Sequence, residues 1–166
     1  IELEQIRAHN PDIIYVRGTG QGENGPDADR GAYDSLAFWN RAGVATGQMI
    51  PDDPDVTPPP PPAPAFGDSI GAMTIAGGIM GALFHRERTG EATTVDVSLL
   101  GAGLWSMGAG LALSLQMDVP WAPPPKGGSP SGNPLVGNYL TRDGRYVALC
   151  CLQPGKYWAE AVALIG

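Results

Sequence analysis

The chain has 166 residues, 43% of them hydrophobic, and a formal net charge of −7. This length allows one ordinary domain with a substantial core. The ten lysines and arginines offer no basic surface for a phosphate backbone, which argues against nucleic-acid binding.

The two ends of the sequence are typical of a piece cut from a longer protein. The chain does not begin with Met, and residues 2–9 already have helical spacing. A helix-like segment from Tyr157 to Ile165 stops without a capping residue, and no signal peptide is visible. We therefore expect an internal fragment.

The first part of the chain predicts a strand followed by a glycine-rich loop. Asp12 to Val16 is a short apolar run of the kind found in a buried parallel strand. In the loop, Gly20, Gly22 and Gly25 satisfy the G-x-G-x-x-G pattern of dinucleotide sites. The next residue is Pro26, and no helix follows that could hold a pyrophosphate. A flexible turn is therefore favoured over an NAD or FAD site.

Tyr33 to Ala42 has helical spacing, and a proline-rich segment follows. Prolines recur from Pro51 to Pro64, with five in succession from Pro58 to Pro62. Because proline removes backbone donors and blocks helices, this segment predicts an extended, solvent-facing loop. A PxxP ligand for a partner domain is the alternative, and a surface insertion is the more economical interpretation.

Residues 68–88 predict a long apolar helix that contains four glycines. Each glycine costs a helix about 1 kcal/mol relative to alanine, so burial against other elements must stabilise it. His85, Arg86 and Arg88 suit the negative C-terminal end of this helix. His85 is interpreted as a capping or solvated residue, and no metal site is predicted.

Asp68 stands at the start of this helix and is the best functional clue in the sequence. The positive end of the helix dipole and unpaired backbone N–H groups favour the carboxylate form that a nucleophile needs. Taken alone, Asp68 is more simply explained as an N-cap, because aspartate is a preferred capping residue. The surrounding motifs have to decide between these two roles.

Thr93 to Val97 predicts a strand and Leu99 to Met117 a second helix, so strands and helices alternate as in α/β folds. Residues 97–117 carry no charge and on length alone could span a bilayer. The glycines, serines and Gln116 in this run favour a buried helix of a large domain.

The last part of the chain predicts a smaller unit. Residues 118–134 have the Pro- and Gly-rich composition of a linker. A β-hairpin is expected around Asp143-Gly144, a pair suited to a type I′ turn. Cys150 and Cys151 would point to opposite faces of a strand and cannot pair without strain. With no other cysteine, a reducing cytoplasm is the simplest setting.

Several short motifs occur together along the chain. In chain order they are NPDIIY, GAYDSLAFWNRAG, GDSIGAM, HRERTG, TTVDVSLL and TRDGR. In this order they resemble the family III CoA-transferases almost from end to end. Each motif alone is only moderately specific, and their shared order carries the resemblance.

The resemblance implies an α/β fold with a Rossmann-like large domain built on a parallel sheet. Residues 1–117 would be part of that domain, 118–134 a linker, and 135–166 the beginning of a smaller α+β domain. Members of the family are longer than this chain and form interlocked dimers, so a homodimer of the intact protein is expected.

The resemblance also assigns roles to residues. The aspartate that opens the helix is the nucleophile of the family, and it aligns with Asp68. Tyr33 and Leu99 occupy positions that border CoA in relatives, and Gly127-Gly128 falls near a glycine-rich loop that covers the active site in some. The alternatives are a core aromatic for Tyr33, simple packing for Leu99 and a flexible turn for the glycines.

The chemistry expected from this resemblance is CoA transfer through a protein carboxylate. Asp68 would attack the thioester of an acyl-CoA, and an aspartyl-CoA thioester would follow through a mixed anhydride. The substrates would be an acyl-CoA and a small carboxylic acid, with no permanently bound cofactor and no metal. We expect a cytoplasmic enzyme without nucleic-acid or membrane partners.

Two other functions remain open from the sequence. The α-methylacyl-CoA racemases share the fold and the helix-opening aspartate, and use a His and Asp pair for proton transfer next to the thioester. Their His lies near the position of Tyr33-Asp34, where this chain has none, which favours a transferase. The other alternative is an inactive or structural chain that acts in association.

Overall fold

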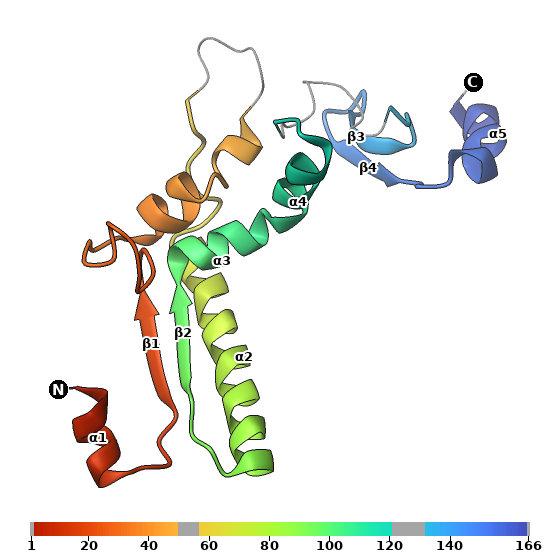
Figure 1. Cartoon of the computed structure of the whole chain (residues 1–166). Coiled ribbons are helices and arrows are strands. Elements are labelled where there is room, and N and C mark those ends of the chain that lie inside the picture. The colour runs from red at the N-terminus through yellow and green to blue at the C-terminus, as the bar shows by residue number, and fades with distance from the viewer. Residues whose placement is uncertain (1, 50–56, 121–131, 166) are drawn as a thin grey trace. The chain divides into compact units, whose positions relative to one another are not determined.

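The computed structural model describes residues 2–49, 57–120 and 132–165. These residues form two compact units, one within 2–49 and 57–120 and the other within 132–165 (Figure 1). The domain boundaries expected from the sequence stay a prediction for the intact protein.

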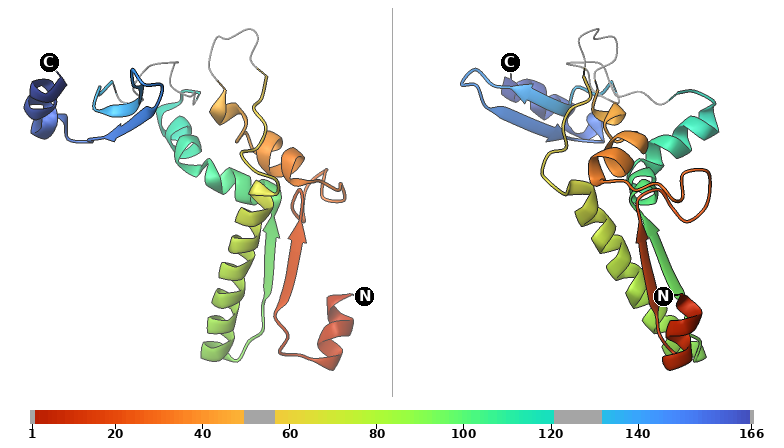
Figure 2. Two further views of the ribbon diagram at one scale, coloured as in Figure 1. Left: turned by 180° about the vertical axis from the view of Figure 1, so that it is seen from behind. Right: turned by 90° about the vertical axis from the view of Figure 1, so that its left-hand side faces the viewer.

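A β-α-β arrangement forms the centre of the first unit. Strands β1 (Tyr15–Thr19) and β2 (Thr94–Ser98) run parallel, and helix α2 (Phe66–Thr89) lies between them in the sequence. Figures 1 and 2 show α2 alongside the two strands, with its N-terminal end at the carboxyl ends of both. The parallel pair and its covering helix confirm the predicted α/β fold class.

An ion pair between the two strands matches their register. Arg17 of β1 lies opposite Asp96 of β2, and its Nη2 donates to Asp96 Oδ2 at 2.6 Å. Shifting the pairing by one residue would break this contact and turn every side chain to the other face of the sheet. The pKa of Arg17 is raised, first by this hydrogen bond and then by the one that Arg17 donates to Glu23.

Strand β1 begins later than the sequence predicts. The predicted strand at residues 12–16 starts with a turn, in which the Ile13 N–H donates to Asn10 O at 3.2 Å. This turn follows helix α1 (Leu3–His9) and uses backbone groups that a strand would need for its ladder. The paired segment therefore starts only at Tyr15.

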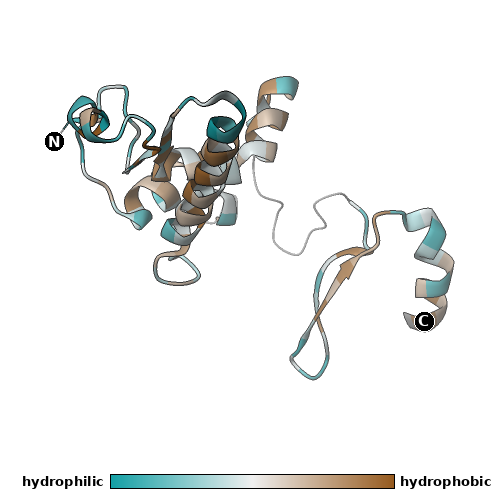
Figure 3. Cartoon of the chain, turned by 90° about the horizontal axis from the view of Figure 1, so that it is seen from below, coloured by the Kyte–Doolittle hydropathy of each residue, from teal (hydrophilic) through white to brown (hydrophobic). Residues whose placement is uncertain are grey.

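Helix α2 approaches β2 closely through one of its glycines. A Cβ added to Gly78 would lie 2.5 Å from Val95 Cγ1, whereas one added to Gly77 meets no described atom within 4 Å. The backbone of α2 at Gly78 therefore packs directly on the side chain of Val95. The opposite face of α2 leaves Met73 and Phe84 exposed, and Figure 3 shows brown, hydrophobic colour along much of the helix.

The second predicted helix is two helices. Helices α3 (Leu99–Ser106) and α4 (Gly108–Met117) meet at an angle of 64°, with Met107 between them. Met107 has φ −91° and ψ 3°, outside the helical range, and the glycine that follows it weakens a continuous helix. Among the described residues, α2 and the bent α3–α4 pair are apolar enough to cross a membrane by length and composition, a test that buried core helices also pass.

The hydrophobic core of the first unit includes a short π-helical segment, η1 (Ser35–Arg41). The sequence predicts an ordinary helix here, but the Ala42 N–H donates five residues back to Ala37 O at 3.1 Å. Phe38, which is fully buried, and Trp39 pack there with Ala102 of α3. The 3₁₀ turn η2 (Thr46–Gln48) follows.

The second unit contains the predicted hairpin and a helix. Strands β3 (Val136–Leu140) and β4 (Tyr146–Cys150) pair antiparallel, and helix α5 (Pro154–Ile165) follows them. Of the turn residues, Gly144 alone has positive φ, at 77°. A type I′ turn needs positive φ at both central residues, so the turn type predicted from Asp143-Gly144 is wrong.

The hairpin closes instead by a turn whose last residue is left-handed. The Gly144 N–H donates to Thr141 O at 3.0 Å, and the Thr141 N–H donates to Arg145 O at 2.8 Å. This pattern is a type I turn followed by a glycine bulge. Thr141 Oγ1 donates to Asp143, which lowers the pKa of that carboxyl together with a hydrogen bond from Arg145.

The contact between Gly78 and Val95 predicts opposite effects for two neighbouring substitutions. Gly77→Ala should stabilise the protein by about 1 kcal/mol, because alanine is the better helix former. Gly78→Ala makes the same helical gain but forces its Cβ onto a buried valine, which costs about 1–3 kcal/mol. Thermal unfolding of both variants measures the difference, and equal melting temperatures would contradict the packing.

Candidate active site

Asp68 is the third residue of α2 and not its N-cap. The cap position is Ala65, which has φ 56° and ψ 32°, and its side chain offers no hydrogen bond to the helix. A left-handed conformation costs roughly 1 kcal/mol for a residue other than glycine. The simple capping role that the sequence suggests for Asp68 is therefore wrong.

Asp34 caps α2 from another segment of the chain. The Gly67 N–H donates to both carboxylate oxygens of Asp34, at 3.1 Å to Oδ1 and 3.0 Å to Oδ2. Asp34 also precedes η1, but its side chain does not cap that element. Its negative charge instead satisfies a donor at the positive end of α2.

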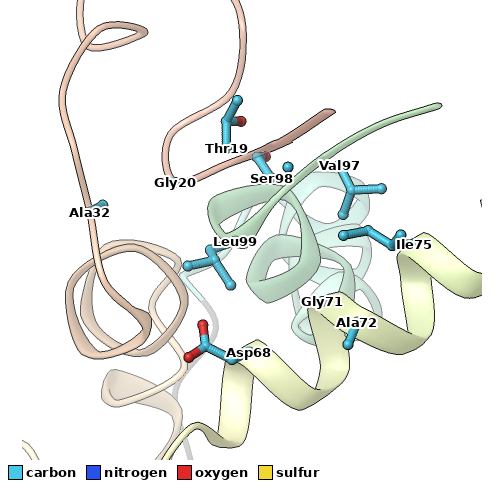
Figure 4. Close-up of a pocket in the computed structure, with 11 residues that line it drawn as sticks. Thr19, Gly20, Ala32, Asp68, Gly71, Ala72, Ile75, Val97, Ser98 and Leu99 are labelled. Atoms are coloured by element: carbon cyan, nitrogen blue, oxygen red, sulfur yellow. The ribbon is translucent and has the colours of Figure 1, made fainter. Parts of the chain in front are cut away.

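Asp68 lies at the edge of a pocket of about 340 Å³. The pocket opens at the carboxyl ends of the two parallel strands, the usual place for ligands in open α/β sheets. In Figure 4 the Asp68 carboxylate extends from the start of α2 toward the side of the pocket where Leu99 lies. The other walls come from the β1 end, the β2 end and α2: Thr19, Gly20, Gly71, Ile75, Val97 and Ser98.

Asp68 also lines a second hollow. This hollow measures about 370 Å³, and Tyr33, Asp34 and Pro61 line it together with Asp68. Asp68 itself is exposed. The exposed Asp68 side chain thus contributes to the lining of two separate hollows.

The structure brings most of the predicted site residues to Asp68. Leu99, the first residue of α3, lines the first pocket, and Tyr33 lines the second hollow. Tyr33 is 82% exposed, so it is not the core aromatic that the sequence left open as an alternative. Gly127 and Gly128 lie outside the described residues.

Contacts with η1 hold both the proline segment and the start of α2. The Trp39 Nε1–H donates to Pro59 O at 2.6 Å. Phe66 is the first residue of α2, and its ring packs edge-on against the rings of Phe38 and Trp39, with 6.2 Å between the ring centroids in each pair. Segments that are distant in sequence thereby fix where α2 begins.

Ion pairs hold the glycine-rich loop beside the pocket. Arg41 of η1 forms an ion pair with Asp27, with 2.7 Å between Nη2 and Oδ2. Its Nη1 also donates a hydrogen bond to Gln21 Oε1 at 2.7 Å. Between these two loop residues, Glu23 pairs with Arg17 of β1. Sequence reasoning did not identify these contacts, because charges far apart in the chain give no periodic signal.

The described lining of both hollows contains no lysine or arginine. The phosphates of a ligand such as CoA would therefore be held by groups outside these linings. Within the described part of the chain, no three His, Cys, Asp or Glu side chains gather as a metal site would require.

The chain belongs to CoA-transferase family III, whose sequence profile matches residues 1–166. The cinnamoyl-CoA:phenyllactate CoA-transferase of Clostridium sporogenes is 29% identical to it over 90% of this chain and 35% of that protein. The (R)-2-hydroxy-4-methylpentanoate CoA-transferase of Clostridioides difficile is also 29% identical, over 99% of this chain and 39% of its own length.

Solved structures share the fold. The crystal structure of Rv3272 from Mycobacterium tuberculosis superposes with a TM-score of 0.78 at 27% identity, covering 99% of this chain and 40% of that one. A CAIB/BAIF family protein from Brucella suis gives a TM-score of 0.73 at 25% identity and covers 41% of its chain. The chain thus spans well under half the length of these relatives.

Trp39 offers a test of how the start of α2 is held. Trp39→Phe keeps an aromatic ring but removes the N–H that Pro59 O accepts, which should cost about 1–3 kcal/mol. Residues 57–65 should then become more sensitive to limited proteolysis. Trp105→Phe is the matched control, because Trp105 is 84% exposed, and it should change neither measurement. Equal behaviour of the two variants would contradict the anchoring contact.

Proposed function

We propose that the intact protein transfers CoA between an acyl-CoA and a carboxylic acid, with Asp68 as its nucleophile. One observation carries the proposal: Asp34 caps α2, which leaves the Asp68 carboxylate exposed in the lining of two hollows, one of them at the carboxyl ends of the strands. Membership of CoA-transferase family III supports this chemistry.

The proposed reaction begins with attack of an Asp68 oxygen on the thioester carbonyl. The carbon–sulfur bond breaks, and a mixed anhydride and CoA thiolate result. The thiolate then attacks the Asp68 carbonyl of the anhydride, which releases the first carboxylate and leaves an aspartyl-CoA thioester. The incoming carboxylate repeats these steps in reverse, so no net proton or electron is consumed.

The neighbours of Asp68 have proposed roles in binding. Leu99, in the lining of the first pocket, and Tyr33, in the lining of the second hollow, would contact the CoA thioester. Gly127 and Gly128 would belong to a loop that closes over it. We also propose that the intact enzyme is a cytoplasmic homodimer that needs no metal or permanently bound cofactor.

The relatives and the pocket together suggest which acids to test. Two relatives that match at least 90% of this chain are named for phenyllactate and 2-hydroxy-4-methylpentanoate, which are 2-hydroxy acids with apolar side chains. The pocket beside Asp68 has apolar walls at Ile75 and Val97 and hydroxyl groups at Thr19 and Ser98. An acid of this class fits both kinds of wall.

Asp68→Asn tests the proposal in the full-length protein. An amide cannot form the anhydride, so CoA exchange should fall by at least about 1000-fold. In the parent enzyme, acyl-CoA followed by hydroxylamine should convert Asp68 to a hydroxamate, which mass spectrometry detects. Asp29→Asn, an exposed carboxylate that lines neither hollow, is the matched control.

The same experiment separates the alternatives. Turnover at the parental rate in Asp68→Asn would refute the nucleophile. Deuterium incorporation next to the thioester without CoA exchange would indicate a racemase-type proton transfer. An absence of adduct, exchange and CoA binding would support a structural role in association.

Exposed Tyr33 predicts an effect on binding with little effect on chemistry. Tyr33→Ala removes a side chain that lines the second hollow but leaves Asp68 and its helix in place. The KM for acyl-CoA should rise about tenfold, while kcat changes less than about threefold. Steady-state kinetics measures both, and an unchanged KM would remove Tyr33 from the binding site.

A further inference from the structure

The start of α2 needs a hydrogen-bond acceptor that its own cap residue does not provide. A helix leaves its first N–H groups without partners inside the helix. At α2 the cap is Ala65, which has no side-chain acceptor. The Asp34 carboxylate, 33 residues earlier in the chain, accepts the Gly67 N–H with both oxygens instead.

The contact between Asp34 and Gly67 is tightly constrained. A Cβ on Gly67 would collide with Asp34 Oδ1 and with the ring of buried Phe38. Only glycine therefore lets the helix backbone come close enough for the N–H to reach the carboxylate. Asp34 and Phe38 together fix the residue that directly precedes Asp68.

Of the residues at this contact, Asp34 lines the second hollow beside Asp68, whereas Phe38 and Gly67 do not. Tyr33 also lines this hollow, and Asp34 is half-buried. Its hydrogen bonds are charge-assisted and so stronger than bonds between neutral groups. A bond of this kind at the second helical residue sets the direction of the Cα–Cβ bond of the third.

We infer that Asp34 is a positioning residue, which fixes the first turn of α2 through Gly67 and so aims the Asp68 carboxylate at the thioester. The inference rests on the proposed function of Asp68. Asp34 itself forms no covalent bond and transfers no proton; its carboxylate acts only as a hydrogen-bond acceptor.

Two substitutions separate the acceptor from the charge. Asp34→Ala removes the acceptor, whereas Asp34→Asn keeps one oxygen for the Gly67 N–H and loses the charge. Displacing a reacting group by about 1 Å costs roughly 100-fold in rate, so adduct formation on Asp68 should fall about 100-fold in Asp34→Ala. Asp34→Asn should stay within about tenfold of the parent.

The measurement is single-turnover formation of the hydroxylamine-trapped Asp68 adduct in the full-length enzyme, alongside kcat and KM. The KM for acyl-CoA should change less than about threefold in both variants, because Asp34 aims the nucleophile and does not hold the CoA. Asp29→Ala removes an exposed carboxylate from the preceding loop and should behave as the parent.

Each outcome decides the inference. Parental rates in Asp34→Ala, or rates in Asp34→Asn as low as in Asp34→Ala, overturn it, and the second result would assign a role to the charge or to a proton. If Asp34→Ala does not fold, the Asp34→Asn rate alone decides, and failure of that variant to fold also overturns the inference. If the parent itself forms no adduct, the proposed function has failed, which is a separate result.

Discussion

The unsatisfied N–H groups at the start of α2 are the constraint around which the site is built. The first N–H groups of this 24-residue helix must find acceptors within the protein or donate to water. This chain supplies one from Asp34, at the start of η1, and so leaves Asp68 exposed. Had Asp68 been the cap, its oxygens would have been occupied by its own helix.

The same region holds its unusual backbone conformations. Ala65 has a left-handed backbone conformation although it is not glycine. The segment η1 is π-helical, so its backbone hydrogen bonds span five residues, one more than in an α-helix. Both are maintained by packing, because Phe66 contacts the rings of Phe38 and Trp39. Conformations that cost energy locally tend to persist where function requires them, and here both adjoin the candidate nucleophile.

The fold could be predicted in large part, because hydrophobic spacing reveals each element separately. The β-α-β core, α5 and the hairpin were all expected from short-range patterns. The bend at Met107 and the late start of β1 were not, because hydrophobic spacing does not reveal the backbone angles of one residue or a short turn such as the one from Asn10 to Ile13. The hairpin turn type failed for a similar reason: the Asp-Gly pair was read without the Thr141–Arg145 pairing that closes the hairpin.

The candidate site was predicted in one respect and missed in another. A single acid before an apolar helix is visible in the sequence, and resemblance to a family is what singled out Asp68 as a nucleophile. No local pattern reveals that Asp34 would reach the same helix end, since the two are far apart in the chain and one lies before a π-helical turn. The acid that looks like a cap in the sequence, Asp68, is left exposed, and Asp34, which directly precedes η1, provides the cap. Only the path of the chain through η1 and the proline segment distinguishes them.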